Sequence, residues 1–252
     1  MPAPRPDPVP VAVRAILGRA GALYRQGLGL LLPLALAFSL LDAILQSAAG
    51  EDDALLTGAL AVSIVTFMLL QAVVVQFVRE TDEGRQPTDA GPLVRAVLPV
   101  LGTALGATVL SGLGAIVGLI CLVVPGLVLL TWWLVVVPVV VVERRPIVES
   151  LGRSRELVRG HGWTVFVVLL VQLALIVGTA LVVGLLTVEA GETVWSIGYV
   201  VTSTLVTPLA ALIVAVAYVA LRDAEQADAA AAPDTETTDE DEPRDGDRLT
   251  FG

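Results

Sequence analysis

Long apolar runs alternate with short polar segments along most of the chain. A run of about 18 or more apolar residues is long enough to cross a bilayer as a helix. Residues 97–142 hold no charge and, at ~1.5 Å per residue, would form a helix near twice the hydrocarbon thickness, so they must fold back. Pro125-Gly126 is the best turn signal in the second half of that stretch. The pattern predicts six spans, at residues 28–48, 55–78, 97–120, 126–142, 163–188 and 194–221.

Amphipathic segments precede these spans. In residues 147–160, Arg and Glu side chains lie opposite an apolar stripe, and the same pattern occurs at 11–26 and, in shorter form, at 93–97. A basic amphipathic helix beside a span usually lies in the headgroup region, although a plain cytosolic helix at 11–26 is the alternative. We therefore predict three units, each made of an interfacial helix followed by two spans.

Small residues recur along the predicted third span. Gly102, Gly106, Gly114 and Gly118 have the spacing that lets a transmembrane helix pack tightly against a neighbour. Ordinary flexibility near a helix turn is the alternative explanation for the last two. The spacing favours a closely packed third helix.

The two ends of the chain differ from the rest. Residues 1–10 contain five prolines, which prevent regular structure. Residues 222–252 are rich in Ala, Asp, Glu, Thr and Pro, and such a composition cannot bury a core. We expect a disordered leader at 1–10, a six-helix membrane domain at 11–221 and a disordered acidic cytoplasmic tail at 222–252.

Composition supports a polytopic membrane protein. Apolar residues make up 56% of the chain, charged residues 16%, and the mean hydropathy is +0.83. Soluble domains are roughly 45–50% apolar and 25% charged. The tail carries three arginines against eleven acidic residues, a net charge of −8, so most of the formal −10 belongs to it. A single cysteine, Cys121, excludes an intrachain disulfide and a thiolate metal cluster.

The placement of arginine predicts the orientation in the membrane. All basic residues are arginines, and all lie in the segments that would share one side, together with both termini. The loops on the opposite side carry only acidic residues, namely Glu51, Asp52, Asp53, Glu189 and Glu192. Positively charged loops usually stay in the cytoplasm. We expect a bacterial plasma-membrane protein, with both termini cytoplasmic; the bacterial origin rests only on the use of arginine without lysine.

Residues 124–166 resemble a known bacterial signature. It is carried by Val124-Pro125-Gly126, Pro138, Glu143, the segment 149–160 and Trp163. The sequence is similar there to the membrane domain of bacterial glycerophosphodiester phosphodiesterases and to related stand-alone six-span membrane proteins, and it is compatible with them over residues 10–221. The resemblance implies a six-helix membrane domain. It implies no activity, because the phosphodiesterase activity of those enzymes belongs to a separate catalytic domain.

Asp42 is the one carboxylate well inside a predicted span. An ionisable group in a membrane costs roughly 2.5–3.5 kcal/mol on insertion scales and is a functional candidate by default. Asp42 also lies only several residues from the end of its span, where water is near. A solvated or hydrogen-bonded structural acid is therefore the alternative to a functional intramembrane group.

Arg153, Arg155 and Arg159 are candidates for contacts with anionic lipid headgroups. Basic residues near a membrane surface attract such lipids by about 1 kcal/mol each. Setting the topology and anchoring the interfacial helix is the alternative role, and the two roles are compatible. His161, the single histidine, lies beside Gly162 and Trp163, which favours an interfacial residue over a proton shuttle.

These patterns predict an all-α, polytopic membrane bundle without catalytic activity, a catalytic site, a metal or a cofactor. We expect an interaction or membrane-organising domain whose partners are the lipid bilayer, its anionic lipids and other membrane proteins, but no nucleic acid. A small-molecule or lipid transporter is the alternative, because matched prolines in repeated spans often mark binding sites. An enzyme of the resembled kind needs several histidines and metal-binding carboxylates, and this chain has one histidine.

Overall fold

The computed structural model describes residues 12–50, 52–187 and 191–231. Within these ranges it contains helices and no strand. The predicted leader at 1–10 lies outside the described residues. The helices are α1 Val13–Ala49, α2 Asp53–Asp82, α3 Ala90–Cys121, α4 Val123–Trp133, α5 Val136–Glu143, α6 Ile147–Val158, α7 Gly162–Thr187 and α8 Gly191–Ala231.

Six stretches of this helical structure are long and apolar enough to cross a membrane, with α4 and α5 counted together. The prediction of an all-α membrane bundle with six spans is thereby confirmed. Many large side chains point outward, including Ile44, Phe67 and Ile176, each at least half exposed. Lipid tails are as apolar as these side chains, so their exposure suits a membrane-embedded surface.

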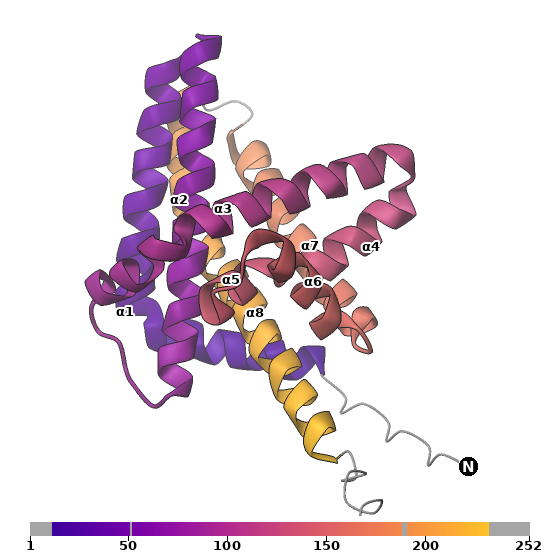
Figure 1. Ribbon diagram of the computed structural model, residues 1–252. Helices are drawn as coiled ribbons and strands as arrows, with labels where there is room; N and C mark the ends of the chain where they lie inside the picture. The colour runs from indigo at the N-terminus through magenta and orange to yellow at the C-terminus, as the bar shows by residue number, and fades with distance from the viewer. Residues whose placement is uncertain (1–11, 51, 188–190, 232–252) are drawn as a thin grey trace, which may run out of the picture.

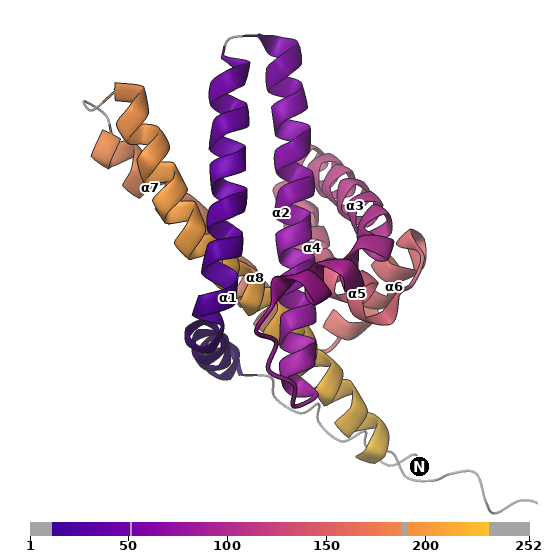
Figure 2. The same ribbon diagram turned by 90° about the vertical axis from the view of Figure 1, so that its left-hand side faces the viewer.

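The core lies where α2 and α8 meet. α1 and α2 form an upright hairpin, with α7 on one side and α3 to α6 on the other, while α8 crosses behind the hairpin (Figure 2). α8 packs against α1, α2 and α7 as it crosses the molecule (Figure 1). The centre of α2, around Val73 and Val74, and the centre of α8, around Leu212, are fully buried. These two helices therefore hold the bundle together.

The predicted interfacial helix at 11–26 is not a separate element. It is the first part of α1, which runs without interruption to Ala49 and bends so that this part lies across the foot of the bundle (Figure 1). Pro33 lies inside α1 and can donate no backbone hydrogen bond, which permits a bend without ending the helix. The predicted apolar face is confirmed at Ile16 and Ala20, which are buried in the core. The segment at 93–97 likewise belongs to the start of α3.

The turn between the third and fourth spans lies earlier than predicted. α3 ends at Cys121, Leu122 is extended, and α4 starts at Val123, so Pro125-Gly126 falls inside α4. A proline in the first turn of a helix costs little, because the backbone N–H groups there have no partner within the helix. Pro125 thus helps to start α4 and does not form the turn.

The glycines of α3 pack against the returning α4, which confirms the predicted close packing for most of them. A Cβ atom on Gly114 would lie 2.7 Å from Cζ3 of Trp133, and one on Gly118 would lie 3.0 Å from Cα of Gly126. Gly106 is in similarly close contact with Ile147 of α6, whereas Gly102 has open space beside it. Small residues therefore allow the α3–α4 hairpin to close.

The fourth span is broken, although the sequence predicted one helix at 126–142. α4 ends at Trp133 and α5 begins at Val136. Pro138 has no N–H to donate to the carbonyl group of Leu134, and its ring crowds that carbonyl. Leu134 and Val135 therefore form a turn between the two helices, and the helical hydrogen bonds resume where Val139 donates to the carbonyl oxygen of Val135 at 3.1 Å.

The last helix is longer than predicted, so the expected tail at 222–252 is wrong for its first ten residues. α8 continues to Ala231. The residues after Leu221 include several alanines, which favour helix, and Glu225, which binds an arginine of α6. Residues 232–252 lie outside the described residues.

Candidate functional site

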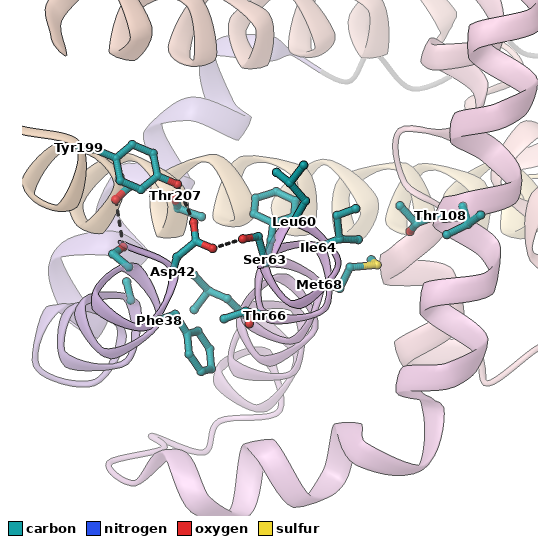
Figure 3. Close-up of a pocket in the computed structure, with 16 residues that line it drawn as sticks. Phe38, Asp42, Leu60, Ser63, Ile64, Thr66, Met68, Thr108, Tyr199 and Thr207 are labelled. Carbon is teal, nitrogen blue, oxygen red and sulfur yellow. Dashed lines mark hydrogen bonds between the residues drawn. The ribbon is translucent and has the colours of Figure 1, made fainter. Parts of the chain in front are cut away.

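A cavity of about 620 Å³ lies between α1, α2, α3 and α8 (Figure 3). It is lined by one carboxylate, several hydroxyl groups and a larger set of apolar side chains. The polar lining residues are Ser39, Asp42, Ser63, Thr66, Thr108, Tyr199, Ser203 and Thr207. The apolar ones are Ala35, Phe38, Leu60, Ile64, Phe67, Met68, Leu70 and Val109.

The carboxylate of Asp42 accepts hydrogen bonds from three side chains. Nε2 of Gln46 donates to Oδ2 at 3.1 Å, and the hydroxyl of Tyr199 donates to the same oxygen at 2.8 Å. The hydroxyl of Ser63 donates to Oδ1. Figure 3 shows Asp42 between Tyr199 of α8 and Ser63 of α2. Asp42 is thus a hydrogen-bonded acid, which is compatible with both the structural and the functional role expected from the sequence.

Other polar contacts fix α8 against α1 and α7, and one of them, between Ser203 and Ser39, lies in the cavity lining. The hydroxyl of Ser203 donates to Oγ of Ser39 at 3.0 Å, and Nε2 of Gln172 donates to the carbonyl oxygen of Ala210 at 2.6 Å. The hydroxyl of Tyr24 donates to the carbonyl oxygen of Leu205 at 2.9 Å. These bonds between helices far apart in sequence hold the polar wall of the cavity in position.

Two further features bear on what the cavity can hold. The hydroxyl oxygen of Thr108, on α3, is buried and makes no hydrogen bond within the described residues. Buried polar groups usually have a hydrogen-bond partner, so this hydroxyl is an exception among the residues that line the cavity. A smaller cavity of about 170 Å³ shares Tyr199 with the first and is also lined by Gln46 and Trp195. The Asp42–Tyr199 pair therefore separates two hollow regions.

A second polar cluster is centred on Arg153 of α6. Its Nη1 and Nη2 atoms donate to the two carboxylate oxygens of Glu225, at 2.6 and 2.5 Å. Its Nε atom donates to the carboxylate of Glu143 at 3.2 Å. Arg145 pairs with the same carboxylate at 2.8 Å, and the hydroxyl of Tyr218 donates to it at 3.2 Å. The cluster joins α5, α6 and α8.

Carboxylates and guanidinium groups of the chain face one another in this cluster. Glu143 pairs with Arg145 and Arg153, and Arg153 also pairs with Glu225 and, at 3.7 Å, with the exposed Glu156. The side chain of Arg153 is only 17% exposed, and its hydrogen bonds to Glu225 raise its pKa further above the usual arginine range. A bidentate arginine–carboxylate pair is both strong and geometrically specific. The arrangement is suited to holding helices together.

The three predicted lipid-binding arginines therefore differ. Arg153 is occupied by Glu143 and Glu225 and is the least available for a headgroup. Arg155 is exposed, with its guanidinium carbon 4.4 Å from the ring centre of Trp132, and Arg159 is exposed at the end of α6. Ser154 faces inward, where its hydroxyl donates to the carbonyl oxygen of Trp132 at 2.6 Å. Arg155 and Arg159 are therefore the exposed arginines of this segment, beside the exposed carboxylates of Glu149 and Glu156.

Sequence reasoning singled out Asp42 and Arg153 but missed their partners. Tyr199 is 157 residues from Asp42, and Glu225 is 72 residues from Arg153, so no local spacing connects them. Glu143 was noted only as part of the resemblance. His161 is half-buried between α6 and α7. Within the described ranges, no three His, Cys, Asp or Glu side chains come together as a metal site would require.

Comparison with known proteins adds no relationship to this geometry. No family model matches the chain, and neither a curated protein nor a solved structure matches it.

Proposed function

We propose that this chain is a non-catalytic protein of the bacterial plasma membrane that organises lipids or other membrane proteins at its arginine-rich face. Both termini lie in the cytoplasm in this proposal, because every basic residue falls on that side. The resemblance to the membrane domain of glycerophosphodiester phosphodiesterases and related six-span proteins supports the same location.

The observation that carries this proposal is that the arginines of α6 differ in their contacts and exposure. Arg153 turns inward and ties the helix to α5 and α8, while Arg155 and Arg159 remain exposed. A helix fixed by one arginine holds its other arginines at a constant place relative to the spans. Surface cations held in this way attract anionic headgroups by about 1 kcal/mol each, within a Debye length.

The test compares lipids that remain bound to the purified chain. In an Arg155→Gln, Arg159→Gln double variant, we expect phosphatidylglycerol and cardiolipin to bind up to about thirtyfold more weakly, measured by native mass spectrometry. A loss of about 2 kcal/mol in attraction would account for this, and added salt should reduce retention in the wild type. Arg14→Gln, Arg25→Gln is the matched control on the arginine-bearing part of α1. Unchanged retention in the α6 variant would contradict the proposal.

A carrier of a small molecule or lipid is the second candidate function. The cavity beside Asp42 favours it, since it is large enough for a ligand and lies between helices of different repeats. A carrier must expose such a cavity to each side of the membrane in turn. Single cysteines at Ser39 and Ser203, in a Cys121→Ser background, should then react with impermeant reagents from both sides of oriented vesicles. Labelling from one side only would contradict transport.

A further inference from the structure

The surroundings of Asp42 provide hydrogen bonds but no positive charge. Gln46, Ser63 and Tyr199 are neutral donors, and they use three of the roughly four lone-pair positions of a carboxylate. The chain has no lysine, and it has no arginine between residues 25 and 79 or between 159 and 222. The parts of α1, α2 and α8 that surround Asp42 therefore contain no lysine or arginine that could pair with its carboxylate.

The rest of the cavity restricts the kind of cation that fits. Its volume of about 620 Å³ is that of a site for a small organic molecule, which typically measures about 300–1,000 Å³. Phe38, Ile64 and Phe67 make much of the wall apolar. A small metal ion would need several oxygen ligands, whereas the hydroxyl hydrogens of Ser63 and Tyr199 are directed at Asp42.

Two aromatic residues line the cavity that holds the carboxylate, and aromatic rings favour an organic ammonium group. Tyr199 meets Asp42 through its hydroxyl, with one ring face stacked on Trp195, and Phe38 lines the same cavity (Figure 3). The faces of aromatic rings attract ammonium groups, and this attraction strengthens where water is excluded. A carboxylate with neutral donors, aromatic side chains and an apolar wall matches a molecule with a cationic head and an apolar tail.

We propose that this cavity binds an amphiphile with an organic ammonium head, which pairs with Asp42, and an apolar tail, which lies against Ile64 and Phe67. This inference goes beyond the anionic-lipid contacts of Arg155 and Arg159, because it concerns the opposite charge at a different site. Two sources offer this chemistry: a membrane lipid with an amine head, and a free lipophilic ammonium compound.

The experiment measures binding to the purified full chain in a neutral maltoside detergent. Decyltrimethylammonium, added below its micelle concentration, should raise the melting temperature and form adducts in native mass spectrometry. Decyl sulfate, with the same tail and the opposite charge, should do neither. Asp42→Asn should weaken the binding of decyltrimethylammonium by at least about tenfold, because the charge pair is lost. Asp53→Asn, at an exposed position on α2 outside the cavity lining, is the matched control and should bind normally.

Two additional arms complete the test. Phosphatidylethanolamine retained by the wild type and lost from Asp42→Asn would identify a membrane lipid as the source, whereas binding of the added compound alone would identify a free ligand. Ile64→Trp narrows the cavity without replacing a hydrogen-bond partner of Asp42, and it decides the question if Asp42→Asn fails to fold. Equal binding of decyltrimethylammonium to the wild type and these variants, or equal binding of decyl sulfate, would overturn the proposal. Arg155→Gln, Arg159→Gln should leave this binding intact, which separates it from anionic-lipid retention.

Discussion

The Arg153 cluster and the Asp42 cavity both place carboxylates among apolar helices, and they treat the negative charge differently. At Arg153, the carboxylates of Glu143, Glu156 and Glu225 meet guanidinium groups of the same chain, and the cavity next to Tyr218 is smaller, about 240 Å³. At Asp42, neutral donors bind the carboxylate and a cavity adjoins it. A group whose charge is balanced by its own chain is suited to stability, whereas a group left with a negative charge and open space is suited to binding.

This contrast predicts that removing a charge lowers the stability of the protein more at Arg153 than at Asp42. Breaking an ion pair leaves its partner uncompensated, and the cost rises with burial. Replacing a carboxylate that accepts only neutral hydrogen bonds costs little if the replacement keeps those bonds. The variants below test this contrast, beginning with the largest expected effect on stability.

Arg153→Ala should destabilise the chain most. It leaves Glu143 and Glu225 without their shared guanidinium group and removes the ion pair between α6 and α8. We expect a loss of about 2 kcal/mol, below the full cost of a buried pair because Glu225 is 43% exposed. The measurement is thermal unfolding in detergent, with the exposed Arg159→Ala as control. Equal melting temperatures for the two variants would remove the distinction between balanced and unbalanced sites.

Shortening α8 should have an intermediate effect. A chain that ends at Asp223 loses Glu225 and its two bonds to Arg153, whereas a chain that ends at Ala231 keeps them. The first deletion should cost about 1 kcal/mol, since the pair is partly solvated, and the second should leave the melting temperature unchanged. Glu225→Gln in the full chain should reproduce most of the first loss. An equal loss in both deletions would show that the ion pair is not what stabilises this end of α8.

Asp42→Asn should have the smallest effect on stability, below about 1 kcal/mol. The remaining oxygen can accept from Gln46 and Tyr199, and the new amide can donate to Oγ of Ser63. Ser63 can then give its hydrogen to the carbonyl oxygen of Ala59, which lies 3.0 Å away. Thermal unfolding measures the effect, with Asp42→Leu as the comparison, because leucine leaves Tyr199 and Gln46 without an acceptor. A large loss in Asp42→Asn would make this site structural, like that of Arg153.

The spans and their number could be predicted because a membrane imposes length and hydropathy on each helix separately. The ends of helices and the breaks within them were harder to predict, because they depend on single backbone groups. Pro138 carried the signal for the break at Leu134, but in membrane helices proline often only bends the chain, as Pro33 does in α1. The helical end of α8 was missed because its composition resembles a disordered tail, and the bond from Glu225 to Arg153 is a tertiary contact.

The polar sites were predicted only in part for the same reason. Asp42 could be noticed because a carboxylate within an apolar run is unusual. Ser63 and Tyr199 could not be assigned to it, because serine and tyrosine occur throughout membrane helices and their facing depends on how α2 and α8 pack. The surface exposure of Arg155, against the burial of Arg153, likewise depends on the position of α8 and not on the pattern of α6 alone.

Pro208 divides α8 into an upper arm beside the cavity and a lower arm beside the ion pairs. Tyr199, at the cavity, and Glu225, at the ion pairs, lie on the same helix, about 40 Å apart at ~1.5 Å per residue. Pro208 lies between them, where a missing backbone hydrogen bond softens the helix. The lower arm is anchored through Glu225 to Arg153, and the upper arm through Tyr199 to Asp42 and through Ser203 to Ser39. One helix thus connects the ion pairs of α6 with the wall of the cavity.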